Sequence, residues 1–249
     1  MPRFWILTKA MFLVHVRNRI TLFWNMLFPV FLLVVYGLFF SSSEVEGIDY
    51  MNWVLPGVIA LNILAFGLMS SSSMLVNMRE TGVLRRLQAT PVPALHLVSA
   101  YGLVNVAIAA LQSAAIILSA ALFFDYTPTA AGLLRAAPMI ILAIFASVAL
   151  GQIVSGVAPK AGVALALGQI LYFSQMFLSD MVLPIDQLPG WLQRLAGYLP
   201  GYAITQLVRS PLLSGEWSAA LGPQFLLVAG YTVAGGVLAA LFFRWAPRH

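Results

Sequence analysis

The sequence predicts an all-α membrane protein with six transmembrane helices. Of its 249 residues, 61% are hydrophobic and 8% are charged, whereas a soluble domain carries roughly 25% charged residues. Long apolar stretches recur along the chain between short polar breaks, and each can cross a hydrocarbon core about 30 Å thick. The chain has no cysteine, so no disulfide framework or thiolate metal site is expected.

The expected elements follow one another in a simple order. Residues 1–19 combine four basic side chains with apolar residues at helical spacing, which predicts an interfacial helix, with a frayed basic tail as the alternative. The first apolar run is longer than the roughly 7–15 residues of a signal-peptide core, so we expect a retained span. Within one domain of residues 1–249, the predicted spans are 20–40, 53–77, 97–124, 135–157, 163–183 and 222–243.

Charge predicts the orientation of these spans. An even number of spans puts both termini on one side, together with ten of the 13 basic residues: Arg3, Lys9, Arg17, Arg19, Arg79, Arg85, Arg86, Lys160, Arg244 and Arg248. Seven of the 8 acidic residues lie on the other side. The positive-inside rule therefore predicts a multi-pass protein of the cell's inner (plasma) membrane with both termini in the cytoplasm. Because topology explains the basic excess, no nucleic-acid binding is expected.

The predicted spans lack the residues of a proton relay or a metal site. No lysine, histidine or acidic residue falls near the middle of a span, where a charge costs at least about 2.5 kcal/mol. Arg135 and Asp180 fall near span ends, where snorkelling to the interface is cheap. The sequence has no His-Glu-x-x-His motif and no phosphate-binding loop. We therefore expect no catalytic residue, no metal and no ATPase site in this chain.

The loop 78–93 is the most informative polar segment. It carries three arginines and Glu80, the one acidic residue predicted on the cytoplasmic side. Residues 83–89 can form about two helical turns before the prolines that follow. Two leucines would form an apolar ridge flanked by two arginines: Leu84, Leu87, Arg85 and Arg86. Physics alone leaves two readings open, a helix that transmits motion from a docked partner and a simple basic loop.

The segment 184–220 is the second region not expected to cross the membrane. Prolines divide it into pieces that are each too short to span. A helix is predicted to start at Pro189, and Trp191 belongs to an aromatic, apolar face that suits the membrane interface. We predict a re-entrant or extracellular cap after the fifth span.

Both segments resemble signature regions of one family, the ABC-2 type permeases, which are membrane subunits of ATP-binding-cassette exporters. The resemblance is to their drug-resistance-like branch. The family pattern Glu-Arg-Glu-x-Gly-Thr, a basic and leucine-rich helix, then Ala-Thr-Pro-Val is matched by Arg79, Glu80, Gly82, Leu84, Leu87, Ala89, Thr90, Pro91 and Val92. The family's Leu-Pro-x-Trp/Phe-Leu…Pro…Leu-Arg pattern is matched by Leu188, Pro189, Trp191, Leu192, Pro200, Leu207 and Arg209. Met78 and Val83 depart from the first pattern, and Asp180 stands where the family usually has Gly.

The resemblance implies a dimer of two permease copies, expected to be identical, with each copy docked to one cytoplasmic ATPase subunit. ATP and Mg would bind those subunits, and this chain would bind no cofactor. The implied coupling residues are Arg79, Glu80, Gly82, Leu84, Arg85, Arg86, Leu87, Thr90 and Pro91. The two arginines of the short helix, Arg85 and Arg86, would face acids of the ATPase, and its leucines would fill an ATPase groove. The N-terminal helix would be the second contact.

The second and fifth spans line the central path in that family. The implied pathway residues are Asn62, Phe66, Gln169, Phe173, Met176 and Phe177, and the implied extracellular gate is Asp180, Pro189, Trp191, Pro200 and Arg209. Aromatic and methionine side chains adapt to apolar cargo, so we expect a small lipophilic or amphipathic substrate, drug-like or lipid, with membrane lipids around the spans. A polysaccharide or lipid-linked glycan exporter is the alternative within the family. A passive channel, scaffold or intramembrane enzyme is the alternative outside it.

Overall fold

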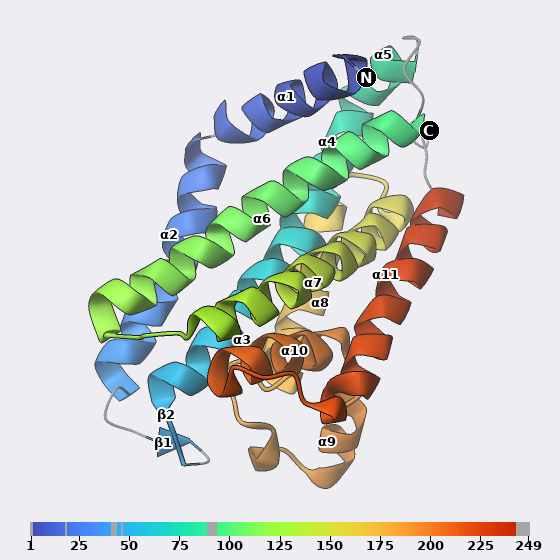
Figure 1. Cartoon of the computed structure of the whole chain (residues 1–249). Coiled ribbons are helices and arrows are strands. Elements are labelled where there is room, and N and C mark those ends of the chain that lie inside the picture. The colour runs from blue at the N-terminus through green and yellow to red at the C-terminus, as the bar shows by residue number, and fades with distance from the viewer. Residues whose placement is uncertain (1, 18, 41–43, 46, 89–93, 243–249) are drawn as a thin grey trace.

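The structure is a computed structural model, and it describes residues 2–17, 19–40, 44–45, 47–88 and 94–242. Helices dominate this part of the chain, which is the all-α membrane class predicted above (Figure 1). In chain order the first half contains α1 Pro2–Arg17, α2 Arg19–Phe40, α3 Tyr50–Ala65, the π-helix η1 Phe66–Ser71, α4 Ser72–Glu80, α5 Val83–Gln88 and α6 Ala94–Phe124. The second half contains α7 Ala130–Val157, α8 Ala161–Leu178, α9 Gly190–Ala196, α10 Pro200–Ser214 and α11 Gly222–Phe242.

Four helices within the described residues are long and apolar enough to cross a membrane. They are Tyr50–Glu80, Ala100–Phe124, Ala130–Val157 and Ala161–Leu178. The apolar stretches Leu27–Phe40 of α2 and Gly222–Leu238 of α11 are shorter. The chain is therefore a multi-pass helical membrane protein, and the count of six spans remains a prediction that needs α2 and α11 as well.

The central element is α3, which is buried along nearly its whole length. Side chains on all its faces, such as Trp53, Ile59 and Leu64, are at most 1% exposed, as expected for a helix that is apolar all round. Asp49 begins the helix, because its carboxylate accepts a hydrogen bond from the Met51 N–H at 3.1 Å. It packs against α2, α6 and α10.

The π-helix η1 continues α3 into α4 and lies in close contact with α7 and α8. Glycines make the contact possible. A Cβ atom at Gly151 would lie 2.0 Å from the Gly67 carbonyl oxygen, and one at Gly168 would lie 2.2 Å from that of Leu68. The Ser72 hydroxyl donates to the Leu68 carbonyl at 2.5 Å. These backbones therefore touch directly, and no larger residue fits between them.

The bundle has two distinct ends. Helices α1, α4 and α5 and the turn between α7 and α8 lie at one end, and α9, α10 and the hairpin of β1 (Glu44–Val45) and β2 (Ile48–Asp49) lie at the other (Figure 1). The two regions singled out by the sequence are thus at opposite ends of the molecule.

The helix within the predicted fifth span ends earlier than the span was predicted to, and the cap that follows remains a prediction. Helix α8 ends at Leu178, five residues before the predicted end, because Asp180 adopts φ +56 and turns the chain out of the helix. The cap is partly an internal element, since α10 is mostly buried and packs against α3, α7, α8 and α11. The 3₁₀ turns Ile185–Gln187 and Ala219–Leu221 flank its helices in the sequence.

Candidate functional site

The first candidate region is the end of α4 and the start of α5. Gly82 separates these helices at φ +72, a left-handed conformation that residues with a Cβ atom adopt only at a cost. The Thr81 N–H donates to the Asn77 carbonyl at 2.9 Å, and the Gly82 N–H donates to that of Arg79 at 3.3 Å. These two hydrogen bonds end α4 and let the chain reverse into α5.

Arg79 points into the protein. Its side chain is 6% exposed, and its guanidinium donates to two carbonyls at the end of α7, to Ser155 at 3.2 Å and to Ala158. The last carbonyls of a helix have no partner within the helix and carry partial negative charge. The Arg79 guanidinium therefore supplies hydrogen-bond donors to these carbonyls and places a positive charge beside their partial negative charge.

Glu80, the next residue, binds the neighbouring helix. Its carboxylate accepts a hydrogen bond from the Ala161 N–H at 3.0 Å. Ala161 is the first residue of α8, and the residue before it, Lys160, provides no side-chain cap. Glu80 therefore takes the place of an N-cap, and its negative charge suits the positive end of the helix dipole.

The remaining coupling candidates differ in exposure. Leu84 is 1% exposed, so its side chain is covered by this chain, and its predicted contact with an ATPase groove would require it to become exposed. Arg86 is exposed and donates to the Thr81 carbonyl at 3.3 Å. The side chains of Arg85 and Leu87, and the whole of Thr90 and Pro91, lie outside the described residues.

The pathway candidates fall into two environments. Asn62 and Phe66 are 7% and 3% exposed within the bundle. On α8, Phe173 and Phe177 are about half exposed, Gln169 is exposed as well, and Met176 is partly buried. The single chain therefore does not bury the α8 candidates together with Asn62 and Phe66, and it leaves an apolar face of α8 uncovered.

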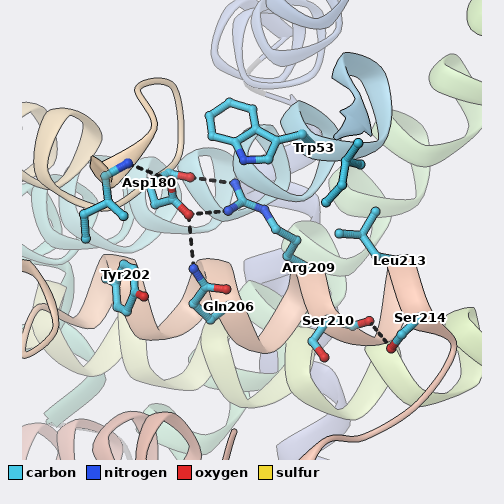
Figure 2. Close-up of a pocket in the computed structure, with 10 residues that line it drawn as sticks. Trp53, Asp180, Tyr202, Gln206, Arg209, Ser210, Leu213 and Ser214 are labelled. Carbon is cyan, nitrogen blue, oxygen red and sulfur yellow. Dashed lines mark hydrogen bonds and ion pairs between the residues drawn. The ribbon is translucent and has the colours of Figure 1, made fainter. Parts of the chain in front are cut away.

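The second candidate region is a buried ion pair at the opposite end. Asp180 and Arg209 are 4% and 6% exposed. The Arg209 guanidinium pairs with the Asp180 carboxylate and donates to its main-chain carbonyl at 2.6 Å (Figure 2). Asp180, which was expected only to lie near a span end, is thus buried within the protein, where its charge is paired with that of Arg209.

Three further groups hold this pair in place. Gln206 donates to one Asp180 carboxylate oxygen at 3.1 Å, and the Ile185 N–H donates to the other at 3.1 Å. The Arg209 guanidinium carbon lies 4.6 Å from the centre of the Trp53 ring, a cation–π distance. Three segments, the start of α3, the turn after α8 and α10, therefore meet at one charge cluster (Figure 2).

A pocket of about 420 Å³ adjoins the cluster. Its lining is mixed, with Trp53, Tyr202 and Leu213 beside Gln206 and the charged pair (Figure 2). The sequence analysis did not identify Trp53 or Gln206. The detectable signal for Trp53 was a tryptophan at the start of an apolar run, in the first helical turn after the Asp49 cap.

The other gate candidates are not part of this cluster. Pro189 precedes α9, where its carbonyl accepts a hydrogen bond from the Leu192 N–H at 2.8 Å. Trp191 is 65% exposed. Pro200 is buried at the first position of α10, where its missing N–H removes no hydrogen bond. None of the three lines the pocket.

Comparison with known proteins supports the resemblance. A family model described as ABC-2 type transporter matches residues 2–213, which include both ends of the bundle. Nodulation protein J of Rhizobium leguminosarum bv. viciae is 33% identical over 81 residues. That stretch is 32% of this chain and 31% of the relative, so the chain matches about a third of the relative's length.

Proposed function

This chain belongs to the ABC-2 type transporter family, and from that premise we propose that it moves a lipophilic or amphipathic substrate outward across the membrane. As an ABC-2 permease it is the membrane-spanning subunit of an ABC exporter, and ATP is hydrolysed by a separate ATPase protein. The proposed cargo is a drug-like compound or a lipid. The observation that carries the export role is the family match over residues 2–213, which includes the signature loop around Glu80, and the lipophilic cargo rests on the exposed apolar and aromatic face of α8.

The proposed assembly has two permease copies and two ATPase subunits, with ATP and Mg on the latter. The exposed apolar face of α8, including Phe173 at 49% and Phe177 at 54%, supports a site for a second copy or for cargo. The exposed Arg86 on the short helix α5 supports a docking contact with acids of the ATPase.

The proposed orientation has six spans, counting α2 and α11, and puts the end that holds α1, α4 and α5 in the cytoplasm of an inner-membrane protein. The basic residues Lys9, Arg86 and Lys160 belong to elements at that end, and the acidic Glu44 and Asp186 belong to elements at the other. The positive-inside rule then orients the bundle. Helix α1 supports an interfacial role, because Trp5 and Ile6 are 62% and 68% exposed.

Reconstitution tests the proposal. The chain is purified from its native membrane with a tag, the co-purifying ATPase is identified, and the complex is placed in proteoliposomes. We expect ATP-dependent movement of lipophilic dyes or fluorescent lipids, and stimulation of ATP hydrolysis by the transported compound. Recovery of no ATPase, or ion conduction without nucleotide, would refute it. Transport of a lipid-linked glycan, with no response to the dyes or lipids, would favour the glycan alternative.

A further inference from the structure

We infer that Arg79 and Glu80 are positioning residues that join α4 to the turn between α7 and α8, so that a displacement of α5 reaches α7 and α8 through them. The inference rests on the proposed function. It assigns these two residues of the signature loop to a contact within the permease, and it leaves docking of the ATPase to exposed groups such as Arg86.

The geometry is that of a double helix cap. Two consecutive residues at the end of α4 bind the two helix ends that face each other across the turn Ala158–Lys160. The Arg79 cation lies at the C-terminus of α7 and the Glu80 anion lies at the N-terminus of α8. Each charge is therefore stabilised by the helix dipole. Reversing the order of the two residues would bring each charge to the wrong pole.

Burial separates this role from docking. Arg79 is 6% exposed, so a partner protein cannot reach its guanidinium without unpacking α4 from α7. The planar guanidinium reaches two carbonyls with separate N–H groups, Ser155 at 3.2 Å and Ala158, a fork that a lysine ammonium does not reproduce. Glu80 is exposed, but its carboxylate accepts the Ala161 N–H at 3.0 Å.

The mechanical consequence follows from the shortness of the connections. Residues 81–82 separate α4 from α5, and residues 158–160 separate α7 from α8. A push on α5 therefore moves the end of α4, and the double cap passes that movement to two candidate spans at once. Without the cap, only side-chain packing joins α4 to α7 and α8, and less of the movement of α4 reaches them.

The test separates binding of the ATPase from transport. In the reconstituted complex, Arg79→Lys and Glu80→Ala are each expected to bind the ATPase subunit with wild-type affinity. Each is expected to lower the substrate moved per ATP hydrolysed by roughly tenfold, as the loss of hydrogen bonds to a charged group implies. Glu80→Gln keeps an acceptor oxygen and is expected to retain at least half of the wild-type ratio. The matched control Arg86→Gln is expected to weaken ATPase binding instead.

A distance measurement gives a second readout that folding alone does not change. The sequence has no cysteine, so Asn77→Cys and Lys160→Cys introduce one pair of spin labels in each permease copy, at exposed positions on α4 and on the turn, and mixing labelled with excess unlabelled permease leaves the distance within one copy as the signal. We expect the same narrow distance distribution with and without ATP in the otherwise unchanged chain. Arg79→Lys in this background should broaden it when ATP is bound.

Several results would overturn the inference. Weaker ATPase binding by Arg79→Lys or Glu80→Ala, as large as that of Arg86→Gln, would make them docking residues. Wild-type substrate per ATP in both variants, a Glu80→Gln defect equal to that of Glu80→Ala, or unchanged label distances would each remove the capping role. Failure of the proposed function is distinct, because then the unchanged chain would itself bind no ATPase or show no ATP-driven transport.

Discussion

The buried pair of Asp180 and Arg209 gives a quantitative test of the packing at the α9 and α10 end of the bundle. Arg209→Ala removes the guanidinium and leaves the Asp180 carboxylate, 4% exposed, with Gln206 and the Ile185 N–H as its remaining hydrogen-bond donors. Breaking a buried ion pair by removing one partner costs about 3–5 kcal/mol, because the other charge remains desolvated. At about 2–4 °C per kcal/mol for a chain of this size, the melting temperature should fall by roughly 6–20 °C.

A double-mutant cycle isolates the pair. Asp180 has φ +56, and a left-handed conformation costs a residue with a Cβ atom roughly 1–2 kcal/mol. Asp180→Gly removes that cost but leaves Arg209 buried without its carboxylate. The double variant Asp180→Gly/Arg209→Ala leaves neither charge, so it should be more stable than Arg209→Ala alone. The expected coupling energy is at the upper end of the ~0.5–3 kcal/mol range for residues in contact.

Thermal unfolding in detergent, followed by loss of the monodisperse peak in size-exclusion chromatography, measures these differences. The control is Arg194→Ala on α9, because that arginine is exposed and donates to the Gly190 carbonyl of its own helix. It should change stability by no more than about 0.5 kcal/mol. An Arg209→Ala melting temperature equal to that of the control would refute the reasoning, as would a double variant whose loss is the sum of the single losses.

Three further predictions concern packing, pH and capping. Gly151→Ala places a Cβ atom 2.0 Å from a backbone oxygen of η1 and should lower the free energy of unfolding by about 1–3 kcal/mol through overpacking. Gly236→Ala is the matched control, because a Cβ atom there meets nothing within 4 Å. Equal melting temperatures of the two variants would contradict the close contact. Burial lowers the pKa of His15 below the usual histidine value of about 6.5, so the folded state binds the proton less readily than the unfolded chain. The free energy of unfolding is therefore highest above about pH 6.5 and declines as the pH falls below that value. His15→Gln should make the melting temperature depend less on pH between pH 7.5 and 5.5. The same dependence on pH in this variant and in the unchanged chain would contradict the prediction. Thr129 caps α7 by accepting a backbone N–H at 3.0 Å, so Thr129→Ala should lower the free energy of unfolding by about 1 kcal/mol, and Thr129→Ser should restore it.

Sequence reasoning worked well where one local property controls the outcome. The apolar run 135–157 lies within α7, and α11 occupies Gly222–Phe242 of the run 222–243, because a long apolar run has to satisfy its backbone hydrogen bonds within one helix. The short helix after Gly82 was predicted for residues 83–89, and α5 occupies Val83–Gln88. Prolines and glycines give such boundaries a local signal.

Sequence reasoning worked less well where the direction of a side chain matters. Arg79 and Arg86 belong to the same basic loop, yet the first is buried against α7 and the second is exposed. Leu84 was predicted to contact a partner, and its side chain lies in the core of this chain. The end of α8 was placed five residues late, because hydropathy does not register the left-handed turn at Asp180.

The sequence by itself determined that this is a membrane protein, that it is helical and which family it belongs to. Those properties follow from composition, from the length of apolar runs and from motifs that are contiguous in the chain. Only the tertiary structure decided which charges meet, because Asp180 pairs with a residue 29 positions away and Arg79 binds carbonyls 76 and 79 positions away. Such contacts depend on how α3, α4, α7, α8 and α10 pack in three dimensions, and no local pattern of residues encodes that packing.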